Sequence, residues 1–168
     1  MSMRLSLRIV IMGVAGCGKS SVGEALAQRL GVPYRDGDDL HTPQAVEKMR
    51  QGIPLTDEDR WPWLDRVATV LASEAPMLVG CSALKRAYRD RIRAGASGPV
   101  QFVYLSGSRE LISSRMAART GHYMPTSLLD SQFAALEAPG PLEALTVDID
   151  QPLPAIVNAI LSQIGAPE

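Results

Sequence analysis

The sequence predicts one α/β domain in which a parallel five-stranded sheet lies between two layers of helices. Short apolar runs with strand character alternate with helical patterns along the 168 residues. Strands separated by helices require right-handed crossovers, which give a parallel sheet covered on both faces. The length suits a single domain with a substantial core, and the chain contains no internal repeat, low-complexity tract or linker. A three-layer α/β/α domain spanning residues 1–168 is therefore expected.

The expected elements follow from the local spacing of apolar residues. The first strand is an apolar run that leads directly into a glycine-rich loop, at residues 5–12. Similar short runs predict four more strands, at residues 33–35, 77–81, 100–105 and 145–149. Helical patterns fill the intervals, at residues 19–30, 43–51, 62–74, 84–94, 109–119 and 154–164. The third of these helices has an apolar face typical of packing against a sheet, formed by Leu64, Val67, Ala68 and Leu71.

The first strand runs into a complete G-x-x-x-x-G-K-[ST] phosphate-binding loop, which comprises Gly13, Val14, Ala15, Gly16, Cys17, Gly18, Lys19 and Ser20. Its glycines allow successive backbone N–H groups to converge on phosphate oxygens, and the helix that follows presents the positive end of its dipole. Lys19 is expected to reach the β- and γ-phosphates, and Ser20 the magnesium ion. A glycine-rich turn that binds nothing is the alternative, but both flanking elements required by the motif are present. The sequence thus predicts a user of a nucleoside triphosphate.

Composition excludes several classes of partner. The net charge of −1 argues against a nucleic-acid surface, which needs a clustered basic excess. No stretch approaches the roughly 18 apolar residues of a membrane span, so no membrane partner is expected and the protein is expected in the cytoplasm. The two cysteines, Cys17 in the loop and Cys81 at a strand end, suggest reduced thiols rather than a disulfide framework.

Ligands of parallel sheets bind outside the carboxyl ends of the strands, so the residues that follow each strand are candidates for the site. Three carboxylates, Asp36, Asp38 and Asp39, follow the second strand. Crowded carboxylates repel one another unless a cation or a donor-rich substrate lies among them. Solvated turn acids are the alternative, but the position beside the phosphate loop favours a functional role.

The third strand is expected beside the first, yet it ends without the acidic residue that many phosphate-loop ATPases use for magnesium. Asp36 is therefore the best candidate for the missing metal partner. The strand instead continues into Ser82 and Lys85, a hydroxyl and a cation expected near the substrate. The arginines that follow are expected to form a solvated helix face, comprising Arg86, Arg89, Arg91 and Arg93.

A helix-start signature precedes the third helix. Thr56 and Asp59 have the spacing of a helix cap, and Pro62 suits the first turn of the helix that follows. Trp63 is expected to anchor this helix entry. Arg60 differs from them, because a guanidinium held rigidly beside the turn suits a substrate carboxylate.

Arg115 and Arg119 lie four residues apart on one helix face, just before a segment rich in polar residues. A mobile segment that carries arginines covers ATP and neutralises developing charge in phosphoryl transfer. A lid is therefore expected at about residues 119–131. The arginines also complement the negative end of the helix dipole, so both roles remain open.

Several motifs together resemble the small, phosphate-loop type of gluconokinase. These are GVAGCGKS, DGDDLH, EKMRQGIPLTDEDRWPWL, CSALKRAYRDRIR, VYLSG, SRMAARTGHYMP, LLDSQF and VDIDQP, and the resemblance extends from about Ile9 to the final helix. It implies ATP-dependent phosphorylation of D-gluconate at its 6-hydroxyl, a nucleoside-monophosphate-kinase-like fold and a dimer. It also implies magnesium as a cofactor and a role in gluconate catabolism feeding the pentose phosphate pathway.

The resemblance assigns roles residue by residue. The implied catalytic residues are Lys19, Asp38 and Arg119. Asp38 would orient and deprotonate the attacking hydroxyl, and Arg119 would neutralise the charge of the transition state. The nucleotide-binding set is the phosphate loop with Ser21, Arg115 and Arg119. The gluconate-binding set is Asp38, His41, Arg60, Ser82, Lys85 and Gln132, and the metal set is Ser20 with Asp36. One departure is Ala45, which stands where the family commonly has an asparagine. Roles for His41 and His122 stay open.

The expected chemistry is direct in-line transfer of the γ-phosphoryl group to a primary hydroxyl without a phosphoenzyme. Positioning and charge neutralisation would supply the catalysis. Two other functions remain possible from the sequence: a different small-molecule kinase, such as a shikimate-kinase relative, and a nucleotide-dependent binding switch. Arg60, Asp38 and Lys85 argue against a switch, which needs no acceptor pocket.

Overall fold

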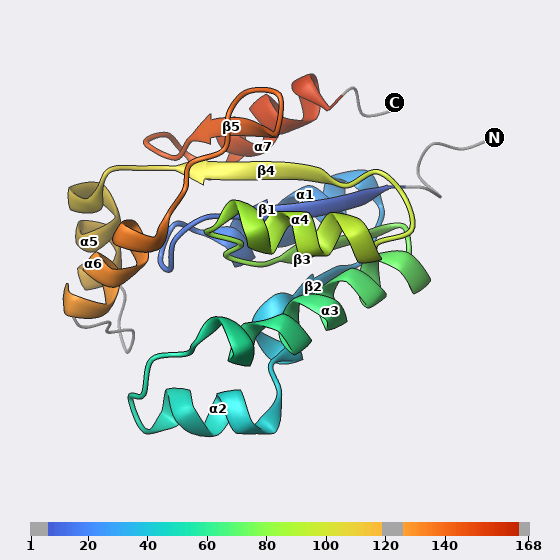
Figure 1. Cartoon of the computed structure of the whole chain (residues 1–168). Helices are drawn as coiled ribbons and strands as arrows, with labels where there is room; N and C mark the ends of the chain where they lie inside the picture. The colour runs from blue at the N-terminus through green and yellow to red at the C-terminus, as the bar shows by residue number, and fades with distance from the viewer. Residues whose placement is uncertain (1–6, 119–125, 165–168) are drawn as a thin grey trace.

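In a computed structural model, which describes residues 7–118 and 126–164, the chain forms a five-stranded parallel sheet (Figure 1). The spatial order is β2-β3-β1-β4-β5, so the third strand lies beside the first, as expected. Every neighbouring pair is parallel. The strands are β1 (Arg8–Met12), β2 (Tyr34–Asp36), β3 (Met77–Gly80), β4 (Gln101–Ser106) and β5 (Ala144–Asp148).

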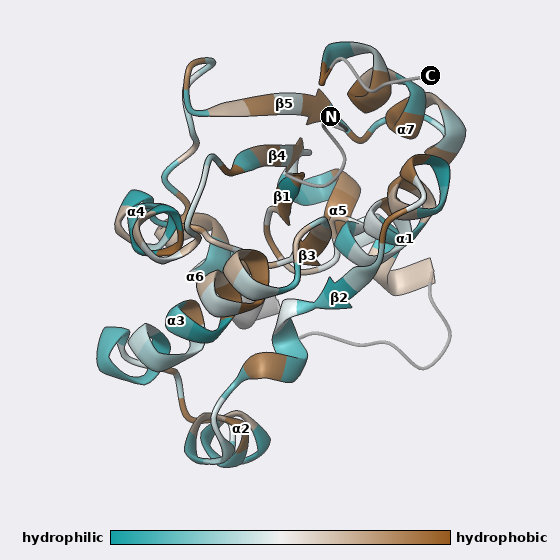
Figure 2. Ribbon diagram, turned by 90° about the vertical axis from the view of Figure 1, so that its right-hand side faces the viewer, coloured by the Kyte–Doolittle hydropathy of each residue, from teal (hydrophilic) through white to brown (hydrophobic). Residues whose placement is uncertain are grey.

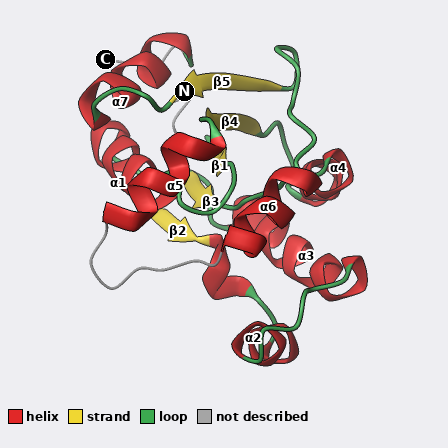
Figure 3. Ribbon diagram, turned by 90° about the vertical axis from the view of Figure 1, so that its left-hand side faces the viewer, coloured by secondary structure: helices red, strands yellow, loops and turns green. Residues whose placement is uncertain are grey.

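Helices cover both faces of this sheet, which confirms the three-layer prediction. Figure 3 shows α1 and α7 on one side of the strands and α3 and α4 on the other. The helices are α1 (Lys19–Leu30), α2 (Pro43–Arg50), α3 (Asp57–Ser73), α4 (Arg86–Gly95), α5 (Arg109–Ala118), α6 (Thr126–Ala135) and α7 (Leu153–Gln163). A short 3₁₀ helix, η2 (Gly37–Leu40), follows β2. Helix α2 extends away from the sheet and packs on α3 (Figure 1).

Two apolar cores lie on opposite faces because successive side chains of a strand point in opposite directions. Ile9 and Ile11 of β1 face α1 and α7, whereas Val10 and Met12 face α3 and α4. All four are fully buried. The central strands are correspondingly hydrophobic, while β2 at the sheet edge is hydrophilic (Figure 2).

The register brings three chain segments to one level at the carboxyl edge of the sheet. Gly80 pairs with Ile11 on one side and with Asp36 on the other. The segments that follow β1, β2 and β3 are the phosphate loop, η2 and the residue 81–85 loop. They consequently meet at the edge where parallel sheets bind their ligands.

The predicted start of one helix is wrong. Helix α3 begins at Asp57 rather than at residue 62, because Thr56 and Asp59 form a complete capping box. Pro62 is therefore inside the helix, not in its first turn. Proline has no backbone N–H, so the helix carbonyl four residues earlier loses its usual donor. Because Pro62 is on the exposed side of the helix, that carbonyl is within reach of water.

Helix α6 was not among the predicted helices, and it overlaps the segment where a lid is expected, at about residues 119–131. Residues 126–131 belong to this helix, while 119–125 lie outside the described residues. Leu129 of α6 is buried in the core beside α1. In the described ranges, no helix combines the length and apolar character needed to cross a membrane. Both cysteines are buried free thiols, as expected.

Candidate active site

The phosphate loop has the backbone conformation that its glycines predict. Gly16 and Gly18 have φ angles of 82° and 99°, in the left-handed region that favours glycine. A Cβ at Gly16 would also lie 2.5 Å from the sulfur of Met116. The Lys19 ammonium donates to the carbonyl oxygens of Gly13 at 2.9 Å and Val14 at 3.1 Å. The first residues of α1 thus sit directly behind a loop that is shaped to bind anions.

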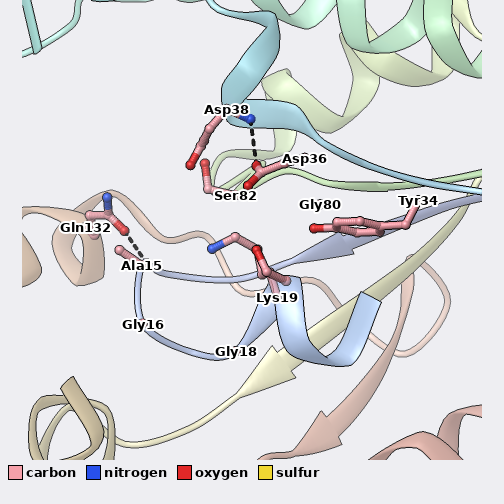
Figure 4. Close-up of a pocket in the computed structure, with 11 residues that line it drawn as sticks. Ala15, Gly16, Gly18, Lys19, Tyr34, Asp36, Asp38, Gly80, Ser82 and Gln132 are labelled. Atoms are coloured by element: carbon pink, nitrogen blue, oxygen red, sulfur yellow. Dashed lines mark hydrogen bonds between the residues drawn. The ribbon is translucent and has the colours of Figure 1, made fainter. Parts of the chain in front are cut away.

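A cavity of about 210 Å³ opens beside this loop. Figure 4 shows Lys19 entering it from one side, with Asp38 and Ser82 on the other. Its lining combines the phosphate loop with the ends of β2 and β3 and with α6: Ala15, Gly16, Gly18, Lys19, Ser20, Tyr34, Asp36, Asp38, Gly80, Ser82 and Gln132. The cavity therefore brings phosphate-binding groups and carboxylates together.

The acidic turn after β2 is ordered by its own side chain. The Asp36 carboxylate accepts a hydrogen bond from the Asp38 backbone N–H at 2.9 Å and so caps η2. Asp38 remains accessible to solvent on the cavity side. Protein atoms around its carboxyl group displace part of the surrounding water and so raise its pKa, and repulsion by the Asp36 carboxylate raises that pKa further. Asp39 is exposed and is not among the lining residues.

Trp63 of α3 holds the same turn through a hydrogen bond and a stacking contact. Its indole N–H donates to the Gly37 carbonyl at 2.7 Å, and its ring stacks on His41 with centroids 4.1 Å apart. Burial, followed by the charge of Arg60, lowers the pKa of His41 to about 4. The imidazole is consequently neutral at physiological pH. Among the described residues, its Nδ1 is buried and has no hydrogen-bond partner.

Arg60 and Lys85, the two cations expected to bind the acceptor, lie near the ring of Tyr88 and are not among the residues that line the cavity. The guanidinium carbon of Arg60 is 5.6 Å and the ammonium of Lys85 is 5.8 Å from the centroid of Tyr88. Ser82, from the same loop as Lys85, reaches the cavity. The loop after β3 thus connects the cavity with the pair of cations.

Comparison with known proteins connects this arrangement with one family. Residues 9–139 match the AAA domain family model. The chain is 43% identical to the thermoresistant gluconokinase of Escherichia coli (strain K12), with 92% of this chain and 91% of that protein covered. A crystal structure of a gluconokinase from Sinorhizobium meliloti 1021 is 51% identical, with a TM-score of 0.89 over 96% of this chain and 93% of that one.

The chain belongs to the gluconokinase family. It is therefore a phosphate-loop kinase, as the resemblance of its motifs implies. The shikimate kinase of Aquifex aeolicus vf5 shares only the fold, at 17% identity and a TM-score of 0.61 over 95% of this chain and 96% of that one. The shikimate-kinase alternative is thus not favoured.

One arginine of this gluconokinase-family chain contradicts the expected solvated face. Arg89 is only 1% exposed. Its guanidinium donates to the carbonyl oxygens of Ala83 at 2.8 Å and Glu137 at 2.8 Å, and to the Glu143 carboxylate at 2.7 Å. Ala83 has a φ of 44°, rare for a residue with a side chain. Arg89 thereby fixes the loop that carries Ser82.

The other three arginines lie nearer the surface. Arg86 and Arg91 are exposed, and Arg91 pairs with Asp65 at 2.7 Å. Arg93 is half-buried and shares Glu143 with Arg89. The prediction of a solvated face is therefore confirmed for Arg86 and Arg91, holds only in part for Arg93 and is wrong for Arg89. The carbonyl acceptors of Arg89 lie in the loop just before α4 and at Glu137.

Gln132 contacts the nucleotide loop in this gluconokinase-family fold. Its side-chain oxygen accepts a hydrogen bond from the Ala15 backbone N–H at 2.6 Å (Figure 4). Arg115 lies half-buried in the last turn of α5. Arg119 and His122, which sequence reasoning also singled out, lie outside the described residues.

Two tyrosines at the site were missed by sequence reasoning. Tyr34 lines the cavity. A Cβ atom at Gly23 would lie 2.2 Å from its ring, and one at Gly80 would lie 2.2 Å from its hydroxyl oxygen. Within the described chain its buried hydroxyl has no hydrogen-bond partner. Tyr88 contacts both expected acceptor cations. Tyr88 lies within the CSALKRAYRDRIR motif and Tyr34 lies outside the resembling motifs, but no pattern in the sequence gives either residue a chemical role.

Proposed function

We propose that this chain transfers the γ-phosphoryl group of ATP to the 6-hydroxyl of D-gluconate, giving 6-phospho-D-gluconate and ADP. One observation carries the proposal beyond family membership: Lys19 and Asp38 approach the same cavity from opposite sides (Figure 4). A phosphate-binding cation and a carboxylate that face each other suit transfer between a bound phosphate and a bound hydroxyl.

On the nucleotide side, the loop from Gly13 to Ser20 holds the phosphates through its backbone N–H groups, and Lys19 neutralises charge on the transferring group. Ser21 and Arg115 complete the nucleotide contacts. Arg119 is proposed as the arginine that stabilises the transition state, so its replacement by alanine is expected to lower kcat by roughly 10³–10⁵. A loss below about tenfold would leave it only a role at the helix dipole.

Magnesium is proposed as the ion that accompanies ATP. Ser20 and Asp36 line the same cavity and offer the hard oxygen donors that this ion prefers. These two residues would hold it, Asp36 through water, while one carboxylate oxygen of Asp36 remains hydrogen-bonded to the Asp38 backbone. When bound, the ion neutralises negative charge on the phosphates.

On the acceptor side, Asp38 orients the 6-hydroxyl and accepts its proton as the oxygen attacks the γ-phosphorus in line. The raised pKa of Asp38 favours this role, because a more basic carboxylate takes up a proton more readily. Arg60 and Lys85 hold the gluconate carboxylate, and Ser82 and His41 contact its hydroxyls. Gln132, whose side-chain oxygen also accepts from the Ala15 N–H, is proposed to bind gluconate from the nucleotide side.

The test is a coupled assay of ADP release with magnesium and ATP, comparing D-gluconate, shikimate, glucose and a blank without acceptor. Turnover that depends on gluconate alone supports the proposal. Turnover with shikimate or glucose instead would keep the kinase chemistry and overturn the substrate. Release of ADP without dependence on any acceptor would indicate a nucleotide-dependent switch.

Three broader assignments accompany this activity. A homodimer is proposed as the assembly, and light scattering should then give twice the chain mass of 18.1 kDa. We place the protein in the cytoplasm, where fractionation should recover it. Its product would feed gluconate catabolism and the pentose phosphate pathway, so deletion of its gene should impair growth on gluconate.

A further inference from the structure

Tyr88 of α4 lies at the centre of a cluster of charged groups formed by Asp57, Arg60 and Lys85. It is 4% exposed, and its hydroxyl donates to the Asp57 carboxylate at 2.6 Å and accepts from the Arg60 guanidinium at 3.2 Å. Arg60 also pairs with Asp57 at 3.7 Å. The tyrosine hydroxyl thus fixes one edge of Arg60 and leaves most of its five N–H donors available to a ligand.

Lys85 lies against the face of the same ring. Its ammonium is 5.8 Å from the Tyr88 centroid, within the range of a cation–π contact. Over the described residues, the Lys85 side chain makes no ion pair or hydrogen bond with the protein. Its backbone is held at the start of α4, where the Lys85 carbonyl accepts from the N–H groups of Tyr88 and Arg89.

The charges of this cluster do not cancel. Arg60 and Lys85 carry two positive charges and Asp57 one negative charge, which leaves a net charge of +1. Burial raises the pKa of Tyr88 to about 12, so the phenol stays neutral and adds no anion. The pair of cations is therefore matched to a ligand group with a single negative charge, such as a carboxylate.

We propose that Tyr88 is a positioning residue that holds Arg60 and Lys85 as a pair for the carboxylate of the acceptor. Its hydroxyl orients the guanidinium and its ring face holds the ammonium, so both cations are arranged before the acceptor binds. Such preorganisation lowers the cost of binding. This inference rests on the proposed function, because it takes the acceptor to be a sugar acid.

The test is Tyr88→Phe, which keeps the buried ring and removes the hydroxyl that contacts Arg60. We expect the KM for gluconate to rise about tenfold, the scale of one hydrogen bond to a charged group, with kcat and the KM for ATP little changed. Tyr104→Phe is the matched control. Tyr104 is a buried tyrosine of β4 in the same core as Tyr88. Among the described residues, the ring that Arg60 and Lys85 contact is that of Tyr88, not that of Tyr104.

The same change in an Arg60→Ala background distinguishes positioning from packing. If Tyr88 acts through Arg60, removing its hydroxyl should lower kcat/KM for gluconate much less in that background than in the wild type. Equal losses in both backgrounds, or a rise in the KM for ATP as large as that for gluconate, would overturn the inference. An unchanged gluconate KM in Tyr88→Phe would overturn it while leaving the proposed function intact, whereas a wild type inactive on gluconate would reject that function itself.

Discussion

The side-chain oxygen of Gln132 accepts a hydrogen bond from the backbone nitrogen of Ala15 at 2.6 Å, although 117 positions separate the two residues. This contact ties α6 to the phosphate loop. Five residues later, the Glu137 N–H donates to the Leu84 carbonyl at 2.8 Å, and its carboxylate accepts from the Arg86 N–H at 2.8 Å. The segment from α6 to residue 137 therefore contacts both the nucleotide loop and the loop that carries Lys85.

Gln132→Glu should weaken ATP binding, because it places a carboxylate of nearly identical shape beside the phosphate-binding amides. Two charges about 4 Å apart repel by about 1 kcal/mol in water and more near a protein surface, so the KM for ATP should rise roughly tenfold. Steady-state kinetics at varied ATP measure it. Gln28→Glu, the same change on the exposed side of α1, is the control. Equal behaviour of the two variants would contradict the position of the Gln132 side chain beside the bound phosphates.

Arg89→Met should destabilise the fold by about 3 kcal/mol, because breaking a buried ion pair leaves uncompensated charge and unsatisfied carbonyls. Glu143 keeps Arg93, which places the expected loss at the lower end of the usual range. Equilibrium urea unfolding measures the change. Arg86→Met, at a side chain 73% exposed, should change stability by less than about 0.5 kcal/mol. A loss below about 1 kcal/mol for Arg89→Met would mean that its hydrogen bonds contribute little.

Local patterns predicted the strands and the phosphate loop, because each depends on residues adjacent in sequence. The start of α1 at Lys19 and the cap formed by Thr56 follow from such patterns. The burial of Arg89 does not, since its carbonyl acceptors lie about 50 residues away or in a strained turn. Spacing alone gives no account of contacts made between distant loops.

The site residues also divide into those that local sequence patterns predict and those that only tertiary packing brings to the cavity. Lys19, Ser20, Asp36, Asp38 and Ser82 were identified from their positions after strands, and all five line one cavity. The contact of Gln132 with the phosphate loop depends on how α6 packs, and α6 itself was not predicted. Tertiary packing thus decides which of the polar residues outside the strand ends reach the cavity.

Asp38→Asn should lower kcat by roughly 10²–10⁴, because an amide cannot accept the proton of the attacking hydroxyl. The KM for ATP should change little, since the phosphate loop is untouched. Steady-state kinetics with saturating gluconate measure the loss. Asp39→Asn removes the same charge from the next residue, which does not line the cavity, and should retain near wild-type kcat. A kcat for Asp38→Asn close to that of Asp39→Asn would exclude Asp38 as the base.

His41 should titrate with a midpoint near 4, as its burial lowers its pKa to about 4. The ordinary value is 6.5, so between these pH values the unfolded chain binds a proton that the folded protein does not. The free energy of unfolding should therefore fall as the pH drops from 6.5 towards 4. Proton NMR of the imidazole C–H measures the midpoint, with His122→Asn to assign the two histidines. A midpoint near 6.5 would show that His41 is hydrated in solution.

The central claim is that the cavity directs the γ-phosphoryl group to the 6-hydroxyl of gluconate. Phosphorus NMR of the product formed from magnesium, ATP and D-gluconate tests it most directly. The account predicts a phosphomonoester whose phosphorus couples to the two protons of the C6 methylene group. A phosphorus signal coupled to any other carbon-bound proton, or ADP and inorganic phosphate as the only new species, would contradict it.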